Sequence, residues 1–199
     1  MTNTFDDRET RERHRAGFAK KQARAQGEKG LLIVHTGDGK GKSTAAWGMV
    51  LRCLGHGKRA GIVQFIKGAL PSAERDFFQA AELCDFHVAG KGYTWTAENR
   101  AENEMAANDG WRRAERLLAD GRHAVVVLDE LNVVLKYRYL DIDEVLRGLE
   151  KRSEKTHVIV TGRHAPRALI DAADLVTEMK SVKHPYRDQG IKAQAGIEF

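Results

Sequence analysis

Three glycines alternate with polar residues near the start of the chain, at Gly37, Gly39 and Gly41. Glycines at this spacing let the backbone adopt positive φ values and turn several N–H groups toward one point. Lys42 follows with a mobile cation, and Ser43 with a hydroxyl that suits a metal ion. This order predicts a loop that holds a polyphosphate, made of Gly37, Asp38, Gly39, Lys40, Gly41, Lys42, Ser43 and Thr44.

The residues on either side of the loop support phosphate binding. An apolar run at 31–35 predicts a buried strand before the loop, and 42–54 predicts a helix after it. The strict pattern requires glycine at position 36, where this chain has Thr36, so the first glycine comes one residue late. Because Gly-Lys-Ser is common by chance, a merely structural turn is the alternative. The strand, the alternating glycines and the helix together favour phosphate binding.

Two acids end another buried run. Residues 124–128 are apolar, and Asp129 and Glu130 follow directly. In proteins with such loops, a second strand lies near the first and points a carboxylate at the bound metal, directly or through water. Ser43, Glu130 and Asp129 are therefore the candidate ligands for Mg²⁺ or Mn²⁺, and the pattern leaves open which acid contacts the ion. An acidic turn that caps the next helix is the alternative.

Buried strands alternate with amphipathic helices along the chain, which predicts an α/β fold with a parallel sheet and helices on both faces. The apolar runs predict strands at 31–35, 61–65, 124–128 and 157–161, with a further short strand at 174–178. The helical stretches are 42–54, 73–82, 98–118 and 142–151.

The chain has 199 residues, 42% of them hydrophobic, a composition that indicates one globular domain at 30–199 preceded by a basic arm at 1–29. The formal charge is +5, and the arm holds eight Lys/Arg against five Asp/Glu, which leaves 30–199 near balance. The composition of residues 8–26 predicts an exposed helix or a solvated tail.

Cys53 and Cys84 lack metal-site or redox spacing, which predicts that both are buried thiols. No apolar run could cross a bilayer, so a cytoplasmic protein is expected.

From about residue 13 to 199 the chain resembles the P-loop type of corrinoid adenosyltransferase. The markers are the segments 36–44, 63–68, 92–95, 127–131, 161–163, 182–186, 190–194 and 196–199. The resemblance accounts for the late first glycine, which members of this family share. It implies a three-layer P-loop NTPase (RecA-like) fold, with a mainly parallel central sheet and an N-terminal helical arm before a domain at 30–199.

The resemblance also implies a reaction in adenosylcobalamin biosynthesis and corrinoid salvage. A reduced Co(I) corrinoid attacks the 5′-carbon of ATP and expels tripolyphosphate, while Lys42, Ser43 and Glu130 stabilise charge on the departing phosphates. A homodimer and an electron donor such as a reduced flavoprotein are implied partners, with no nucleic acid and no membrane. The arm would fold over an active site, its own or that of the other subunit.

Two aromatics, Tyr93 and Trp95, stand in the glycine-flanked segment 90–96. An aromatic surface suits the broad, largely apolar corrin ring. The resemblance implies that the residues at these positions lie against the lower face of the corrinoid and displace its axial ligand, which eases reduction to Co(I). Other members can carry Phe where this chain has Tyr93. Ordinary packing of the loop onto the domain is the alternative.

Two other functions remain open at this point. A different P-loop kinase or ATPase would share the loop and the paired acids, and Arg163 could act as its arginine finger. Such an enzyme would release ADP or orthophosphate, where an adenosyltransferase releases tripolyphosphate. A RecA-like nucleic-acid binder would use the basic arm and would bind DNA or RNA with a steep salt dependence.

Overall fold

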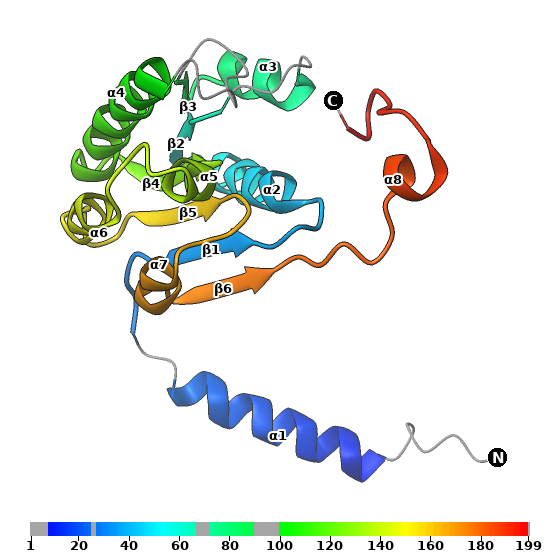
Figure 1. Cartoon of the computed structure of the whole chain (residues 1–199). Helices are drawn as coiled ribbons and strands as arrows, with labels where there is room; N and C mark the ends of the chain where they lie inside the picture. Colours follow the sequence, from blue (N-terminus) through cyan, green and yellow to red (C-terminus); the bar gives the residue numbers. More distant parts are fainter. Residues whose placement is uncertain (1–7, 25–26, 67–71, 90–99, 199) are drawn as a thin grey trace.

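The computed structural model describes residues 8–24, 27–66, 72–89 and 100–198. Within these residues one parallel sheet of six strands has the order β3-β2-β4-β5-β1-β6 (Figure 1). The strands are β1 (Leu32–Thr36), β2 (Arg59–Gln64), β3 (Cys84–Val88), β4 (His123–Asp129), β5 (His157–Thr161) and β6 (Leu175–Glu178).

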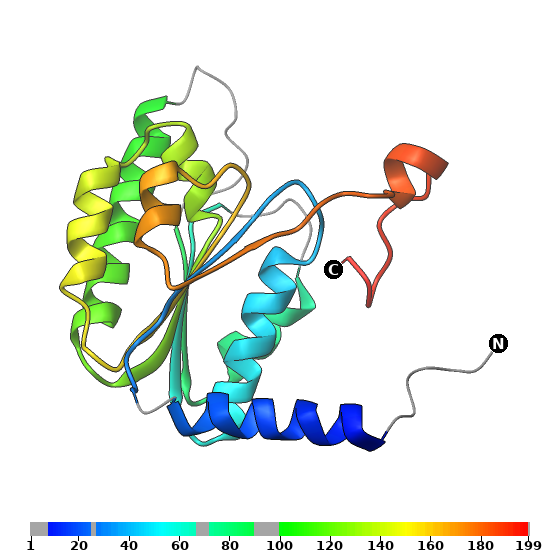
Figure 2. The same cartoon turned by 90° about the horizontal axis from the view of Figure 1, so that it is seen from below.

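Helices cover both faces of the sheet, which gives three layers (Figure 2). One face packs against α4 (Arg100–Ala119), α5 (Leu131–Lys136), α6 (Ile142–Glu150) and α7 (Arg167–Ala172). The other face packs against α2 (Lys42–Gly55) and α3 (Ala73–Ala80). Helices α1 (Arg8–Arg24) and α8 (Pro185–Gln189) lie away from these layers. This architecture confirms the expected P-loop NTPase fold class.

Buried side chains form a hydrophobic cluster on each face of the sheet. Successive strand residues point to opposite faces, so Leu32 and Val34 of β1 join one cluster while Ile33 joins the other. Strand β4 alternates in the same way, with Val126 and Val127 on opposite faces. Continuous apolar runs are therefore what these strands need, because both of their faces are buried.

The five strands expected from apolar runs are present, with ends that differ by up to two residues. Strand β3 was missed because the expected strands were taken from continuous apolar runs, whereas β3 alternates polar and apolar residues at the edge of the sheet, where most of it is half-buried. Helices α5, α7 and α8 were also missed, because they are only five or six residues long. Residues 8–24 form a helix whose described side chains are exposed, as one of the two expectations had it.

Both cysteines are buried and free, which confirms the prediction of reduced thiols. Burial raises the pKa of Cys53, and it raises that of Cys84 to about 11, which disfavours the thiolate form of both residues at neutral pH. No helix in the described part of the chain is long and apolar enough to cross a membrane.

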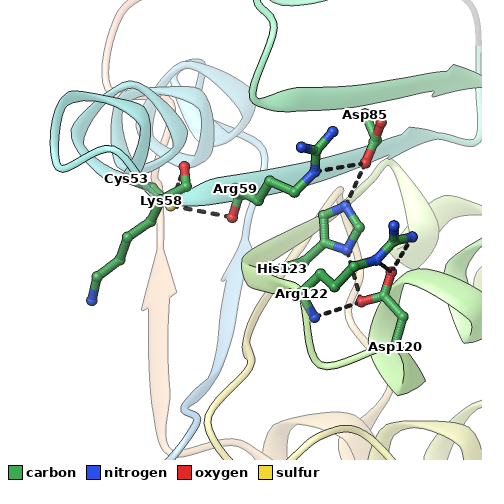
Figure 3. Close-up of polar contacts among 7 residues, drawn as sticks. All are labelled: Cys53, Lys58, Arg59, Asp85, Asp120, Arg122 and His123. Carbon is green, nitrogen blue, oxygen red and sulfur yellow. Dashed lines mark hydrogen bonds and ion pairs between the residues drawn. The ribbon is translucent and has the colours of Figure 1, made fainter.

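A buried histidine links strand β3 to the loop before β4 at the amino ends of the strands. His123 opens β4, and its ring lies between two carboxylates, 2.7 Å from Asp85 on β3 and 3.0 Å from Asp120 (Figure 3). Arg59 also approaches Asp85, at 3.5 Å. Burial alone would raise the pKa of Asp85, but the hydrogen bond from His123 and the contacts with Arg59 outweigh it and lower this pKa. The network therefore connects three neighbouring strands: Asp85 is on the edge strand β3, Arg59 is on β2 and His123 is on β4.

Replacing Asp85 with Asn should lower the free energy of unfolding by about 1 kcal/mol at neutral pH, because a charge-assisted hydrogen bond becomes a neutral one. The aspartate is 37% exposed, and solvent screening keeps the effect small. Its folded pKa lies below the usual 3.8, so this stabilisation is present above pH 3.8 and is lost as the pH falls through the lowered pKa. Urea denaturation of both proteins across this range should show the difference shrinking.

The control is Asp109→Asn, which removes an exposed carboxylate that pairs with Arg113 on α4 at 3.6 Å. It should change stability by less than about 0.5 kcal/mol. Equal losses in the two variants would show that the His123 network adds no stability.

Candidate functional site

The glycine-rich loop runs from the end of β1 to the first residue of α2, and close contact with the chain after β6 sets its shape. Gly37 and Gly41 have φ values of 92° and 102°, which favour glycine. Gly39 donates its N–H to the carbonyl of Met179 at 2.7 Å. A Cβ atom on Gly39 would lie 2.8 Å from that same carbonyl, so no side chain fits there. Glycine is therefore required at 37 for its backbone angle and at 39 for the approach of Met179.

The start of α2 is ready to accept an anion. No side chain caps this helix, its first turn has no acidic residue, and the preceding Gly41 is left-handed. Lys42 is buried, and its ammonium donates to the carbonyl of Gly39. Burial lowers the pKa of Lys42, and Arg163 lowers it further, while Glu130 opposes both. A partly desolvated ammonium beside free helix N–H groups is stabilised by a bound phosphate.

The two acids at the end of β4 have different environments. Asp129 is buried, and both of its oxygens accept hydrogen bonds, from Thr161 at 2.7 Å and from Gln64 at 3.2 Å. Among the described residues no donor bonds to the carboxylate of Glu130, although its N–H donates to Thr161 at 3.0 Å. Asp129 is thus held by the protein, whereas Glu130 remains available to a ligand.

Glu130 also differs from a helix cap. It occupies the position before α5 with φ 62°, yet its side chain makes no capping bond. Burial raises its pKa to about 7, and Asp129 adds to the rise, while Lys42 and Arg163 oppose it. A buried carboxylate beside another acid favours a cation as its partner.

One pocket of about 470 Å³ brings Ser43 together with Asp129 and Glu130, although β5 separates β1 from β4 in the sheet. Arg163 lies in the same pocket, after β5. Sequence reasoning gave no role to other lining residues, which are Trp47, Gln64, Ile66, Val133, Lys136, Tyr137 and His164. Gln64 had a detectable signal, because it is a polar residue in the middle of an apolar run. The others needed the tertiary structure.

The remaining predicted residues fall into two groups. Asp38, Lys40 and Thr44 are exposed, and Lys40 pairs with the carboxylate of Glu198 near the end of the chain. Tyr93 and Trp95 lie outside the described residues, and so does the whole of their segment 90–96.

The oxygen ligands in the pocket suit a hard cation. Within the described ranges no group of three His, Cys, Asp or Glu side chains could hold a metal ion. Mg²⁺ usually keeps several waters and binds through one or two carboxylates together with substrate phosphates. The hydroxyl of Ser43 and the carboxylate of Glu130 meet that requirement, and Asp129 can hold a water of such an ion. The residues therefore fit Mg²⁺ or Mn²⁺ bound together with a phosphate ligand.

Comparison with known proteins matches residues 28–199 to the family described as ATP:corrinoid adenosyltransferase BtuR/CobO/CobP. The chain is 49% identical to a corrinoid adenosyltransferase of Pseudomonas aeruginosa, over 96% of this chain and 95% of that protein. It is 44% identical to the corrinoid adenosyltransferase of Escherichia coli K12, and 45% identical to corrinoid adenosyltransferase CobA of Salmonella typhimurium. Each of these matches covers 89% of both proteins.

Replacing Gly39 with Ala should lower the free energy of unfolding by about 1–3 kcal/mol, because the new methyl group must displace the backbone of Met179. The matched control is Gly48→Ala in α2, where the added Cβ meets nothing within 4 Å. That variant should gain roughly 0.5–1 kcal/mol, since alanine favours the helix. Chemical denaturation of both variants gives the comparison, and a Gly39→Ala protein as stable as the wild type would refute the packing argument.

Proposed function

This chain belongs to the BtuR/CobO/CobP family of ATP:corrinoid adenosyltransferases, and we propose how the residues of its pocket carry out that reaction. The enzyme transfers the 5′-deoxyadenosyl group of ATP to a reduced corrinoid. The observation that carries the proposal is that Ser43, which follows the loop, lines one pocket with Asp129 and Glu130, while the neighbouring Lys42 interacts electrostatically with Glu130.

The chemistry requires little acid or base catalysis. Co(I) supplies an electron pair to the 5′-carbon of ATP, and a cobalt–carbon bond forms. The bond from that carbon to the phosphate oxygen breaks, and tripolyphosphate leaves with the bonding electrons. Negative charge therefore grows on the leaving group, and groups that hold the triphosphate stabilise the transition state.

Lys42 and the start of α2 are proposed to hold the triphosphate. The ammonium of Lys42 and the uncapped N–H groups of the helix converge where the loop ends. Arg163 lies in the same pocket and is proposed as a second cation for the leaving phosphates. In the protein without ATP, Glu130 compensates part of the positive charge on both residues.

Ser43 and Glu130 are proposed to bind Mg²⁺ or Mn²⁺, with Asp129 oriented by Thr161 and Gln64 as the supporting acid. The bound ion would neutralise charge on the triphosphate. The unequal environments of the acids support this division, because the hydrogen bonds to Asp129 occupy both its oxygens while Glu130 has none from the described residues.

The corrinoid and the protein partners are proposed from the family resemblance. Tyr93 and Trp95 would lie against the lower face of the corrinoid and remove its axial ligand, and an electron donor such as a reduced flavoprotein would then reduce the cobalt. The arm 1–29 would cover an active site in a homodimer. The exposed helix α1 supports this role, because it has many polar side chains and lies apart from the core (Figure 1).

The proposal is tested with ATP, Mg²⁺ and a chemically reduced corrinoid, by following the light-sensitive adenosyl product and the released phosphates. Tripolyphosphate should appear in step with the adenosyl product. Lys42→Ala should lower kcat by about 10²–10³-fold, because it removes a preorganised cation from the leaving group. Lys151→Ala, which removes an exposed lysine at the end of α6, is the control and should leave kcat unchanged. Release of ADP or orthophosphate would refute the assignment.

A second pair of variants tests the division between the acids. Glu130→Gln should raise the Mg²⁺ concentration needed for half-maximal activity by about tenfold or more, because it removes a charged ligand. Asp129→Asn should lower kcat and change the Mg²⁺ requirement less. Titration of activity with Mg²⁺ at saturating ATP measures both effects. The larger metal defect in Asp129→Asn would exchange the two roles.

A further inference from the structure

A second pocket lies at the opposite end of the sheet from the phosphate loop. Its volume is about 500 Å³, and it shares no lining residue with the pocket around Glu130. It is formed at the amino ends of β1, β4 and β5, under the last turns of α2. We call it the basal pocket. Nothing in the adenosyl transfer reaction uses it, because a five-residue strand, about 16 Å long, separates the two ends.

The floor of the basal pocket is apolar. Its side chains come from the cluster on the α2 face of the sheet or pack against that cluster: Leu31, Ile33, Met49, Val125 and Ile159. Apolar side chains that line a pocket of this size favour a ligand that brings its own apolar surface. An inorganic ion alone would leave this floor in contact with water.

The rim of the basal pocket is positive. Basic side chains surround the floor, and they are Arg52, His56, Lys58, Arg122, Lys155 and His157. The described lining residues include no carboxylate. Asp120 neutralises Arg122, with contacts of 3.2 Å and 3.1 Å, so that arginine is already paired (Figure 3). In the described part of the chain no acidic side chain pairs with Arg52, Lys58 or Lys155, and Figure 3 shows Lys58 extending away from Asp85 and Asp120.

His157 adds a directional donor to this rim. The N–H of Leu31 donates to Nδ1 of His157 at 3.1 Å, so that nitrogen carries no proton. The ring proton of the neutral imidazole must then be on Nε2, where it can be donated to a ligand. A backbone hydrogen bond thus sets the tautomer of His157. The rim therefore offers two kinds of hydrogen-bond donor: flexible cationic side chains and one imidazole N–H of fixed orientation.

We propose that the basal pocket binds a small organic anion, with its charged head group between Arg52, Lys58 and Lys155 and its apolar body on the floor. Charge complementarity supports this ligand, because like-charged side chains without partners repel one another until an anion enters. The arm of this chain does not fit, since residues 1–29 carry a net charge of +3 and would be repelled by the rim. The inference does not rest on the proposed reaction.

The test uses 8-anilinonaphthalene-1-sulfonate as the probe and the full-length ¹⁵N-labelled protein. Two reference ligands each keep one feature of the probe. N-phenyl-1-naphthylamine has the apolar body without the charge, and sulfate has the charge without the apolar body. The sulfonate should shift the amide signals of Leu31, Gly121 and Ser153, which form or line the pocket, and should leave those of 37–44 in place. It should bind at least about tenfold more tightly than either reference ligand.

The variant Arg52→Gln/Lys155→Gln removes two rim charges and should raise the Kd of the sulfonate about tenfold. The control Arg112→Gln/Arg116→Gln removes the same charge from α4 on the other face of the sheet and should leave the Kd unchanged. All four side chains are exposed, so both variants should fold. Equal Kd values in the two variants, or signal changes confined to 37–44, or equally tight binding of the uncharged amine, would overturn the proposal.

Discussion

Burial of opposite charges at the carboxyl ends of β1 and β4 is the constraint on which the site depends. Lys42 and Glu130 both lose water, and burial lowers the pKa of the lysine while raising that of the acid to about 7. Each group partly compensates the other, but neither is fully neutralised inside the protein. In the proposed reaction a triphosphate with its metal ion would supply both missing partners at once, so the same residues would suit the leaving group of adenosyl transfer.

The strands of the sheet position these charged residues through hydrogen bonds and close backbone contacts. Thr161 on β5 donates to Asp129 and accepts from the N–H of Glu130, so the strand between β1 and β4 links the two halves of the site. The backbone of Met179, which follows β6, packs against the glycine loop on its other side. Strands far apart in sequence therefore position the residues of the proposed phosphate site, and two hydrophobic clusters keep those strands in place.

The polar groups at the two ends of the sheet differ in whether the protein itself supplies their hydrogen-bond partners. At the amino ends, His123 has both of its ring nitrogens paired with carboxylates. At the carboxyl ends, the described residues offer the carboxylate of Glu130 no hydrogen bond, and the helix after Gly41 is uncapped. Groups without protein partners mark the positions of ligands, because an unpaired buried charge is costly until a ligand pairs with it. At the basal pocket the cations of the rim are exposed, and the proposed anion would supply their counter-charge.

The sequence by itself determined the elements whose pattern is local: the glycine loop between strand and helix, the buried parallel strands, and the two acids after 124–128. It also carried the family resemblance, since the motifs are runs of adjacent residues. The short helices were not predictable, because five or six residues have little periodicity, and strand β3 was missed because the search relied on continuous apolar runs, which its alternating sequence lacks. Only the tertiary structure decided that Thr161 and Gln64 hold Asp129, that Met179 requires glycine at 39, and that cations from α2 and two loops meet at the basal pocket. These contacts join residues distant in the chain, and the strand order that brings them together depends on packing across the whole sheet rather than on local sequence.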